Sequence, residues 1–96
     1  MRKITKEAQR AFKRGRPFKK GNTEVKVQED ITALSLHGNI IALENENGVF
    51  IQNAGYFTAT TKERLNGLYG IHIQQKNFEW YLNGEHWDGR IIKIRD

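Results

Sequence analysis

The chain has 96 residues, of which 38% are hydrophobic, so it is long enough for one domain with a small core. Cysteine is absent, which excludes disulfides, thiolate metal sites and cysteine nucleophiles. No stretch approaches the roughly 20 apolar residues that a membrane-spanning helix needs. The charged residues from Arg2 onward leave no room for the apolar region of a secretory signal. We therefore expect a cytoplasmic protein that does not associate with membranes.

The net charge of +5 is unevenly distributed along the chain. Residues 1–20 carry nine basic side chains against one acid, Glu7, which gives this segment +8 and leaves −3 for the remainder. Such asymmetry is typical of proteins that bind polyanions, although a solvated helix face has the same composition. We call residues 1–21 the basic arm. Its candidate binding residues are Lys6, Arg10, Lys13, Arg14, Arg16, Lys19 and Lys20.

A helix of about ten residues is predicted within the basic arm. Thr5 is suited to cap its start, and Gly15 followed by Pro17 predicts an end near Arg14. A helix of this length is unstable alone, so its apolar stripe is expected to dock on the rest of the protein. Residues 15–21 are expected to form a loop. The stripe consists of Ile4, Ala8, Ala11 and Phe12.

Residues 22–96 predict an antiparallel sheet of about six or seven short strands. Apolar and polar side chains alternate in brief runs, beginning with Thr23–Gln28 and ending with Arg90–Ile94. The connections are short, and two of them contain the Asn-Gly pair that favours tight hairpins, at Asn47-Gly48 and Asn83-Gly84. The fold class is therefore α+β in one small domain, 1–96. In the run Phe78–Leu82, the alternation predicts that Phe78 and Trp80 share a buried face.

A short helix is predicted between the fourth and fifth strands. Thr60 and Glu63 have the spacing of a capping box, in which each side chain binds a free backbone amide. Leu65 and Leu68 are expected to face the core, and Gly67 is suited to end the helix. Free amides and threonine hydroxyls at this helix start would also attract a phosphate. We favour the cap, because it uses the same amide donors.

Four segments of the chain resemble small accessory proteins of tailed bacteriophages. They are PFKKGNTEV, LSLHGNIIA, NAGYFTATTKERLNGL and QQK followed by WYLNGEHWDG, and together they extend from about Pro17 to Gly89. The resemblance implies a phage origin and a location in the host cytoplasm. It carries over no activity and no functional residue. Small phage proteins of this kind commonly modulate nucleic acids or host proteins, including defence systems, and this inference rests on analogy.

Enzymatic and metal chemistry find little support in the sequence. The three histidines, His37, His72 and His86, have no metal-ligand spacing. The cluster from Glu85 to Asp88 gathers titratable groups, but no serine or cysteine nucleophile accompanies it. We therefore expect a protein that is not an enzyme and that has no cofactor and no metal.

The segment Arg14-Gly15-Arg16-Pro17 resembles the core of the AT-hook. In that motif an extended Arg-Gly-Arg lies in the narrow minor groove of A·T-rich DNA. The same residues form an ordinary helix stop, and the sequence alone leaves both interpretations open. General attraction of phosphates by the basic arm requires no motif.

The sequence thus yields two functional hypotheses. The first is a non-enzymatic phage accessory protein whose basic arm binds DNA or RNA. The alternative is an inhibitor or modulator of a host protein complex, of the anti-defence or host-takeover type, that uses the same arm against an acidic surface. Exposed aromatic residues such as Tyr56 and Tyr81 are further candidates for base stacking.

Overall fold

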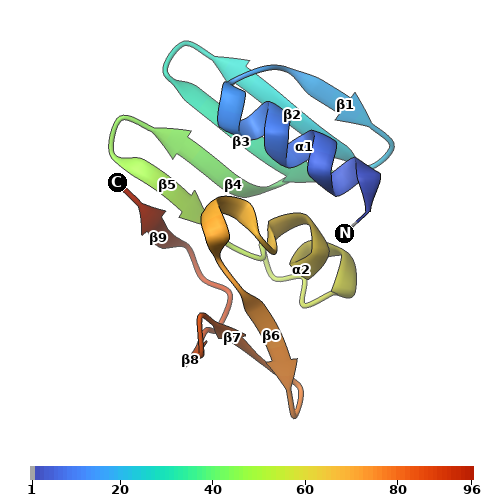
Figure 1. Ribbon diagram of the computed structural model, residues 1–96, viewed down its shortest axis with the longest axis vertical. Helices are drawn as coiled ribbons and strands as arrows, with labels where there is room; N and C mark the ends of the chain where they lie inside the picture. Colours follow the sequence, from blue (N-terminus) through green and yellow to red (C-terminus); the bar gives the residue numbers. More distant parts are fainter. Residues whose placement is uncertain (1) are drawn as a thin grey trace.

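The main sheet consists of six antiparallel strands in the order β1-β2-β3-β4-β5-β9 (Figure 1). The computed structural model describes residues 2–96. The first five strands form a meander, and β9 returns from the end of the chain to pair with β5. The strands are β1 (Phe18–Lys20), β2 (Thr23–Gln28), β3 (Ile31–Leu36), β4 (Asn39–Asn45), β5 (Gly48–Ile51) and β9 (Ile92–Arg95).

Two helices, α1 (Lys3–Arg14) and α2 (Ala59–Leu65), pack against the main sheet and against each other. Figure 1 shows α1 lying across β2 and β3, with α2 below it. Between residues 2 and 96, no helix is long and apolar enough to cross a membrane. The core contains side chains from α1, the sheet, α2 and the C-terminal segment. Its largest fully buried apolar members are Phe12, Leu34, Ile41, Ile51, Leu65, Leu68 and Trp80.

A second sheet of three strands projects from the main body (Figure 1). It follows the short 3-10 helix η1 (Leu68–Gly70), in which Tyr69 has a left-handed φ of 49° that redirects the chain. The predicted α+β class with antiparallel strands is confirmed. However, residues 2–96 form nine strands in two sheets. Those of the second sheet are β6 (Ile73–Lys76), β7 (Glu79–Leu82) and β8 (Glu85–His86).

The start of the main sheet differs from the prediction. Phe18–Lys20, expected in a loop, forms the edge strand β1, so the sheet begins before residue 22. In this strand Phe18 pairs with Val25 and its ring packs against the core. Three residues are too few for alternation to be recognised in a sequence, and two of the three are lysines.

The end of α1 confirms the predicted helix stop. Gly15 adopts the left-handed conformation, with φ 64° and ψ 41°. Its N–H donates to the carbonyl of Phe12 at 3.2 Å, and the N–H of Arg16 donates to that of Ala11 at 2.9 Å. These two bonds are those of a Schellman motif. Arg14-Gly15-Arg16 is therefore folded around the helix end and does not have the extended shape of an AT-hook.

Both predicted caps at helix starts are wrong. The N-cap of α1 is Arg2, whose side chain makes no capping hydrogen bond. Thr5 lies in the first turn of the helix, and its side chain is buried in the protein. The N-cap of α2 is Thr58, whose Oγ1 accepts from the N–H of Thr61 at 3.1 Å. Glu63 does not close a capping box, because its carboxylate accepts from the hydroxyl of Thr5 on the other helix.

The prediction for the strand Phe78–Leu82 is half right. Trp80 is buried, and its ring contacts those of Phe57 and Trp87. Phe78 is 94% exposed, because it lies in the two-residue turn between β6 and β7 and not in a strand. Alternation therefore identified the face correctly but placed the start of the strand too early.

Close packing at Gly89 gives a prediction about stability. Gly89 has φ +86°, and a Cβ there would overlap the carboxamide of buried Asn53. Gly84 has nearly the same φ, +88°, with open space around it. In urea denaturation we expect Gly89→Ala to lower the free energy of unfolding by about 2–3 kcal/mol, and Gly84→Ala by about 1 kcal/mol. Equal losses would show that only the backbone conformation matters.

Candidate nucleic-acid interface

The outward face of α1 carries four of the predicted binding residues. Lys6, Arg10, Lys13 and Arg14 follow one another at intervals of four, three and one, which places them on one side of a helix. All four are exposed, and together with Gln9 they line a shallow depression. The opposite side of the helix is buried against the sheet. Packing of the apolar stripe therefore turns these four cations toward solvent.

The other three predicted residues extend this surface beyond α1. Arg16 follows the helix stop, whereas Lys19 and Lys20 lie on the edge strand β1. All three side chains are exposed. The ammonium of Lys20 is 3.5 Å from the carboxylate of Glu7, which ties the strand to the helix. Among the residues that the structure describes, the other six cations have no carboxylate within ion-pairing distance. We call these seven residues the basic surface.

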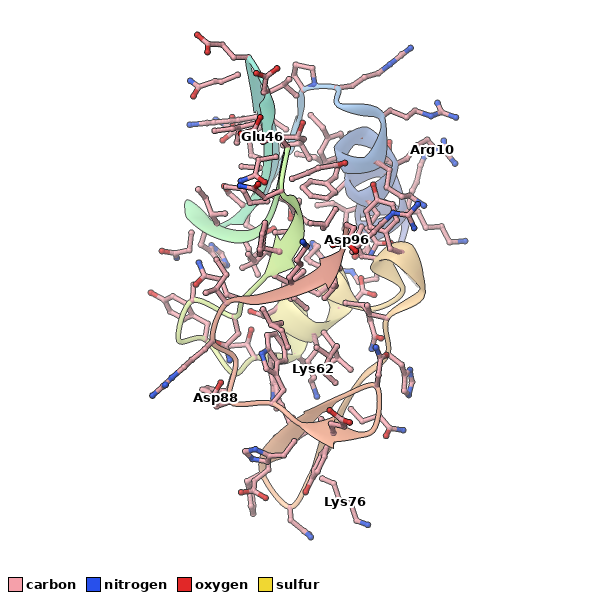
Figure 2. The ribbon with its side chains drawn as sticks, turned by 90° about the vertical axis from the view of Figure 1, so that its left-hand side faces the viewer. Arg10, Glu46, Lys62, Lys76, Asp88 and Asp96 are labelled. Atoms are coloured by element: carbon pink, nitrogen blue, oxygen red, sulfur yellow. The ribbon has the colours of Figure 1, made fainter. Side chains whose placement is uncertain are left out.

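Acidic residues border the basic surface at one end. The turn residues Glu29, Asp30 and Glu46 line one depression together with Lys13 and Arg14. Figure 2 shows Arg10 projecting from α1 on one side of the molecule and Glu46 on the other side at a similar height. A polyanion on the helix face would be repelled at this border, so the carboxylates limit how far the basic surface extends.

A further cation near the basic surface was not predicted from the sequence. The guanidinium carbon of Arg95, on β9, lies 4.7 Å from the ring centre of Tyr69, and Lys13 Nζ lies 6.0 Å from it. The Tyr69 hydroxyl donates to Glu44 at 3.5 Å. Burial raises the pKa of Tyr69, as does Glu44, while Arg95 opposes that rise. Only the pairing of β9 with β5 brings residue 95 to this place.

A buried polar network fixes α1 in position. The Arg64 side chain, from α2, is 2% exposed and donates to Thr23 Oγ1 at 2.9 Å and to Thr5 Oγ1 at 3.0 Å. Its carboxylate partner is Glu63, at 3.3 Å. Burial and the nearby Arg2 lower the pKa of the guanidinium, while Glu63 raises it.

Gln9 adds a second connection between the two helices. Its Nε2 donates to the carbonyls of Arg64 and Asn66, both at 2.9 Å. Gln9 also lines the depression between the cations of α1. The basic surface is thus held by hydrogen bonds as well as by apolar packing.

The other candidate sites acquire no new support. His37, His72 and His86 are exposed on separate elements, and the described residues contain no group of three or more side chains suited to a metal ion. A cavity of about 260 Å³ lies beside the start of α2, and its lining includes Thr58, Thr60 and His37. The lining contains no lysine or arginine that could bind a phosphate. Tyr56 is exposed, as predicted, and Tyr81 is half-buried.

Comparison with models of known protein families gave a match over nearly the whole chain. The model of a protein family described as Kyanoviridae Gp96 protein matches residues 1–93, which is nearly the whole chain. No curated protein and no solved structure matches the chain. The matched region includes the basic arm, both helices and both sheets up to the first part of β9.

Proposed function

Because the chain belongs to the Kyanoviridae Gp96 family of phage proteins, we propose that it is a non-enzymatic accessory protein that binds DNA or RNA in the host cytoplasm. The phage origin expected from the sequence is confirmed by the family match. The observation that carries the proposal is the basic surface, in which seven cations from α1, the helix stop and β1 are all exposed. Six of them lack a carboxylate partner among the described residues and are available to phosphates.

The contacts expected from this surface are with the nucleic-acid backbone. Lysine and arginine bind phosphate oxygens without reading the sequence, and they supply most of the affinity of non-specific complexes. No aromatic residue belongs to the basic surface, and Tyr69, which lies under Lys13 and Arg95, is half-buried. We therefore expect the basic surface to bind phosphates without base stacking. The helix stop at Gly15 likewise gives no reason to invoke minor-groove reading.

Salt dependence of binding tests the proposal. Each phosphate neutralised contributes about 0.9 to the slope of log affinity against log salt concentration on duplex DNA. Five to seven contacts would give a slope of about −4.5 to −6, measured by fluorescence anisotropy with a labelled duplex and with a single strand. A protein that binds neither probe at about 0.02 M salt would disprove the proposal.

A second candidate function is inhibition or modulation of a host protein complex, including a defence system, through an acidic surface on the target. The lack of an aromatic residue on the basic surface favours this candidate over single-strand binding, because single-stranded nucleic acids are usually held by stacking. The two candidates differ in their response to nuclease. Capture of a host protein that persists after nuclease treatment would support the second, provided that it is lost when the cations of the basic surface are neutralised.

A further inference from the structure

The turn between β6 and β7 places a bulky aromatic residue in an unfavourable conformation. Asn77 and Phe78 are its two central residues, with φ of 53° and 68°. Turns with two positive φ values favour asparagine and glycine, because a Cβ atom crowds the following carbonyl, glycine has none, and the short asparagine side chain offsets the cost by local hydrogen bonding. Asn77 suits its position, whereas Phe78 occupies the position usually taken by glycine. The corresponding turn of the next hairpin, between β7 and β8, has the usual pair, Asn83-Gly84.

Among the described residues, no aromatic or cation–π contact offsets this strain at Phe78. Its side chain is 94% exposed, the highest value among the exposed large hydrophobic residues of the described chain. Phe57 and Trp87 contact the ring of Trp80, but Phe78 takes part in none of the aromatic or cation–π contacts found in residues 2–96. A residue that is both strained and exposed lowers stability, so its presence is better explained by binding than by folding.

Charge around the turn distinguishes a protein partner from a nucleic acid. Residues 73–86 contain one lysine, Lys76, and two carboxylates, Glu79 and Glu85, so the projecting sheet carries −1 when His86 is counted as neutral. Glu79 is next to Phe78 and lies 3.5 Å from His86. This charge provides no net attraction for phosphates, whereas a protein pocket with an apolar floor and a basic or neutral rim would be complementary.

We propose that Phe78 is the anchor of a protein-binding surface, inserted into an apolar pocket of a partner protein with a basic or neutral rim. Single aromatic side chains buried in partner pockets commonly dominate binding energy. Figure 2 places Lys76, at the end of the projecting sheet, far along the molecule from Arg10 on α1. The two surfaces are therefore separate, and this proposal does not depend on nucleic-acid binding by the basic surface.

The first test measures strain in the protein alone. Replacing Phe78 with glycine should raise Tm by roughly 3–5 °C, because glycine adopts the left-handed conformation freely. The matched control is Asn77→Gly, where asparagine already tolerates the conformation, and its Tm should change by less than about 2 °C. A fall in Tm with Phe78→Gly would mean that the ring stabilises the fold, and the proposal would be wrong.

The second test identifies what contacts the ring. A photo-crosslinking phenylalanine derivative is placed at position 78 of the full chain, and at exposed Gln74 on β6 as the control, in infected host cells. We expect a nuclease-resistant adduct from position 78 with one protein, and mapping should locate it in an apolar pocket. Wild-type competitor should suppress the adduct, and a Phe78→Gly competitor should need about 30-fold higher concentration.

Other outcomes of the crosslinking would overturn the proposal. An adduct with nucleic acid would make Phe78 a base-stacking residue, and an adduct with a second copy of this chain would make it a self-association contact. Equal adducts from positions 74 and 78, or no adduct from either, would show that Phe78 is not an anchor. Loss of nucleic-acid binding by the basic surface would leave all of these measurements unaffected.

Discussion

Neutralising three cations of α1 together is expected to weaken nucleic-acid binding roughly 500-fold at about 0.1 M salt. The variant is Arg10→Gln, Lys13→Gln and Arg14→Gln, which removes three exposed charges from the centre of the basic surface. Losing three phosphate contacts should reduce the slope of log affinity against log salt by about 3. Fluorescence anisotropy across a salt series measures both quantities on one labelled duplex.

A control with the same net charge separates local contacts from overall attraction. Lys26→Gln, Lys76→Gln and Arg90→Gln removes three exposed cations that lie outside the basic surface, and both variants fall from +5 to +2. We expect the control to lose less than about threefold in affinity, since only long-range attraction weakens. Equal losses in the two variants would show that binding follows net charge and that α1 has no special role.

The features predicted correctly from the sequence depend on neighbouring residues alone. The end of α1 at Gly15 could be predicted because the hydrogen bonds that close the helix there join residues no more than five positions apart. The turn at Asn83-Gly84 has positive φ at both positions, as the pair predicts. The exposure of the four cations on α1 followed from helical spacing. In each case a local rule was sufficient because no distant residue competed for the same groups.

Several other features were not predicted because residues far apart in the sequence determine them. Glu63 was assigned to a capping box three residues away, but its carboxylate bonds to Thr5, 58 positions earlier. Tyr69, in the segment between the two sheets, has a φ of 49°, and a bulky residue with positive φ gives no signal in the sequence. Arg95 joins the surroundings of Tyr69 only through the pairing of β9 with β5. Such contacts are set by the assembled fold.

The network around Arg64 links these distant contacts to the proposed function. Its guanidinium bonds to α1 through Thr5 and to β2 through Thr23, and the Arg64 carbonyl accepts from Gln9. The helix that displays the basic surface is thereby held at both the sheet and α2. A buried cation is expensive unless it is paired and fully hydrogen-bonded, so removing it leaves several polar groups without partners.

Arg64→Ala is accordingly expected to lower the free energy of unfolding by about 3–5 kcal/mol, which corresponds to a fall in Tm of at least about 12 °C. Domains of this kind are typically stable by only about 5–15 kcal/mol, so a substantial unfolded fraction is expected at 37 °C. Urea denaturation and thermal melts measure the loss. Amide hydrogen exchange should report reduced protection in α1 as well as in α2, because both helices lose hydrogen-bonding partners.

Two further variants separate the polar network from the space that Arg64 fills. Arg64→Met keeps most of the side-chain volume without its hydrogen bonds, so it should be destabilised by about 1–3 kcal/mol, the cost of leaving buried polar groups unpaired. Lys62→Ala on the same helix removes a contact with Gln75 at the surface and should cost no more than about 0.5 kcal/mol. If Arg64→Ala were as stable as Lys62→Ala, the network would not hold α1. The position of the basic surface would then depend on apolar packing through Ala8 and Phe12 and on the remaining contacts of α1, such as the Gln9 hydrogen bonds.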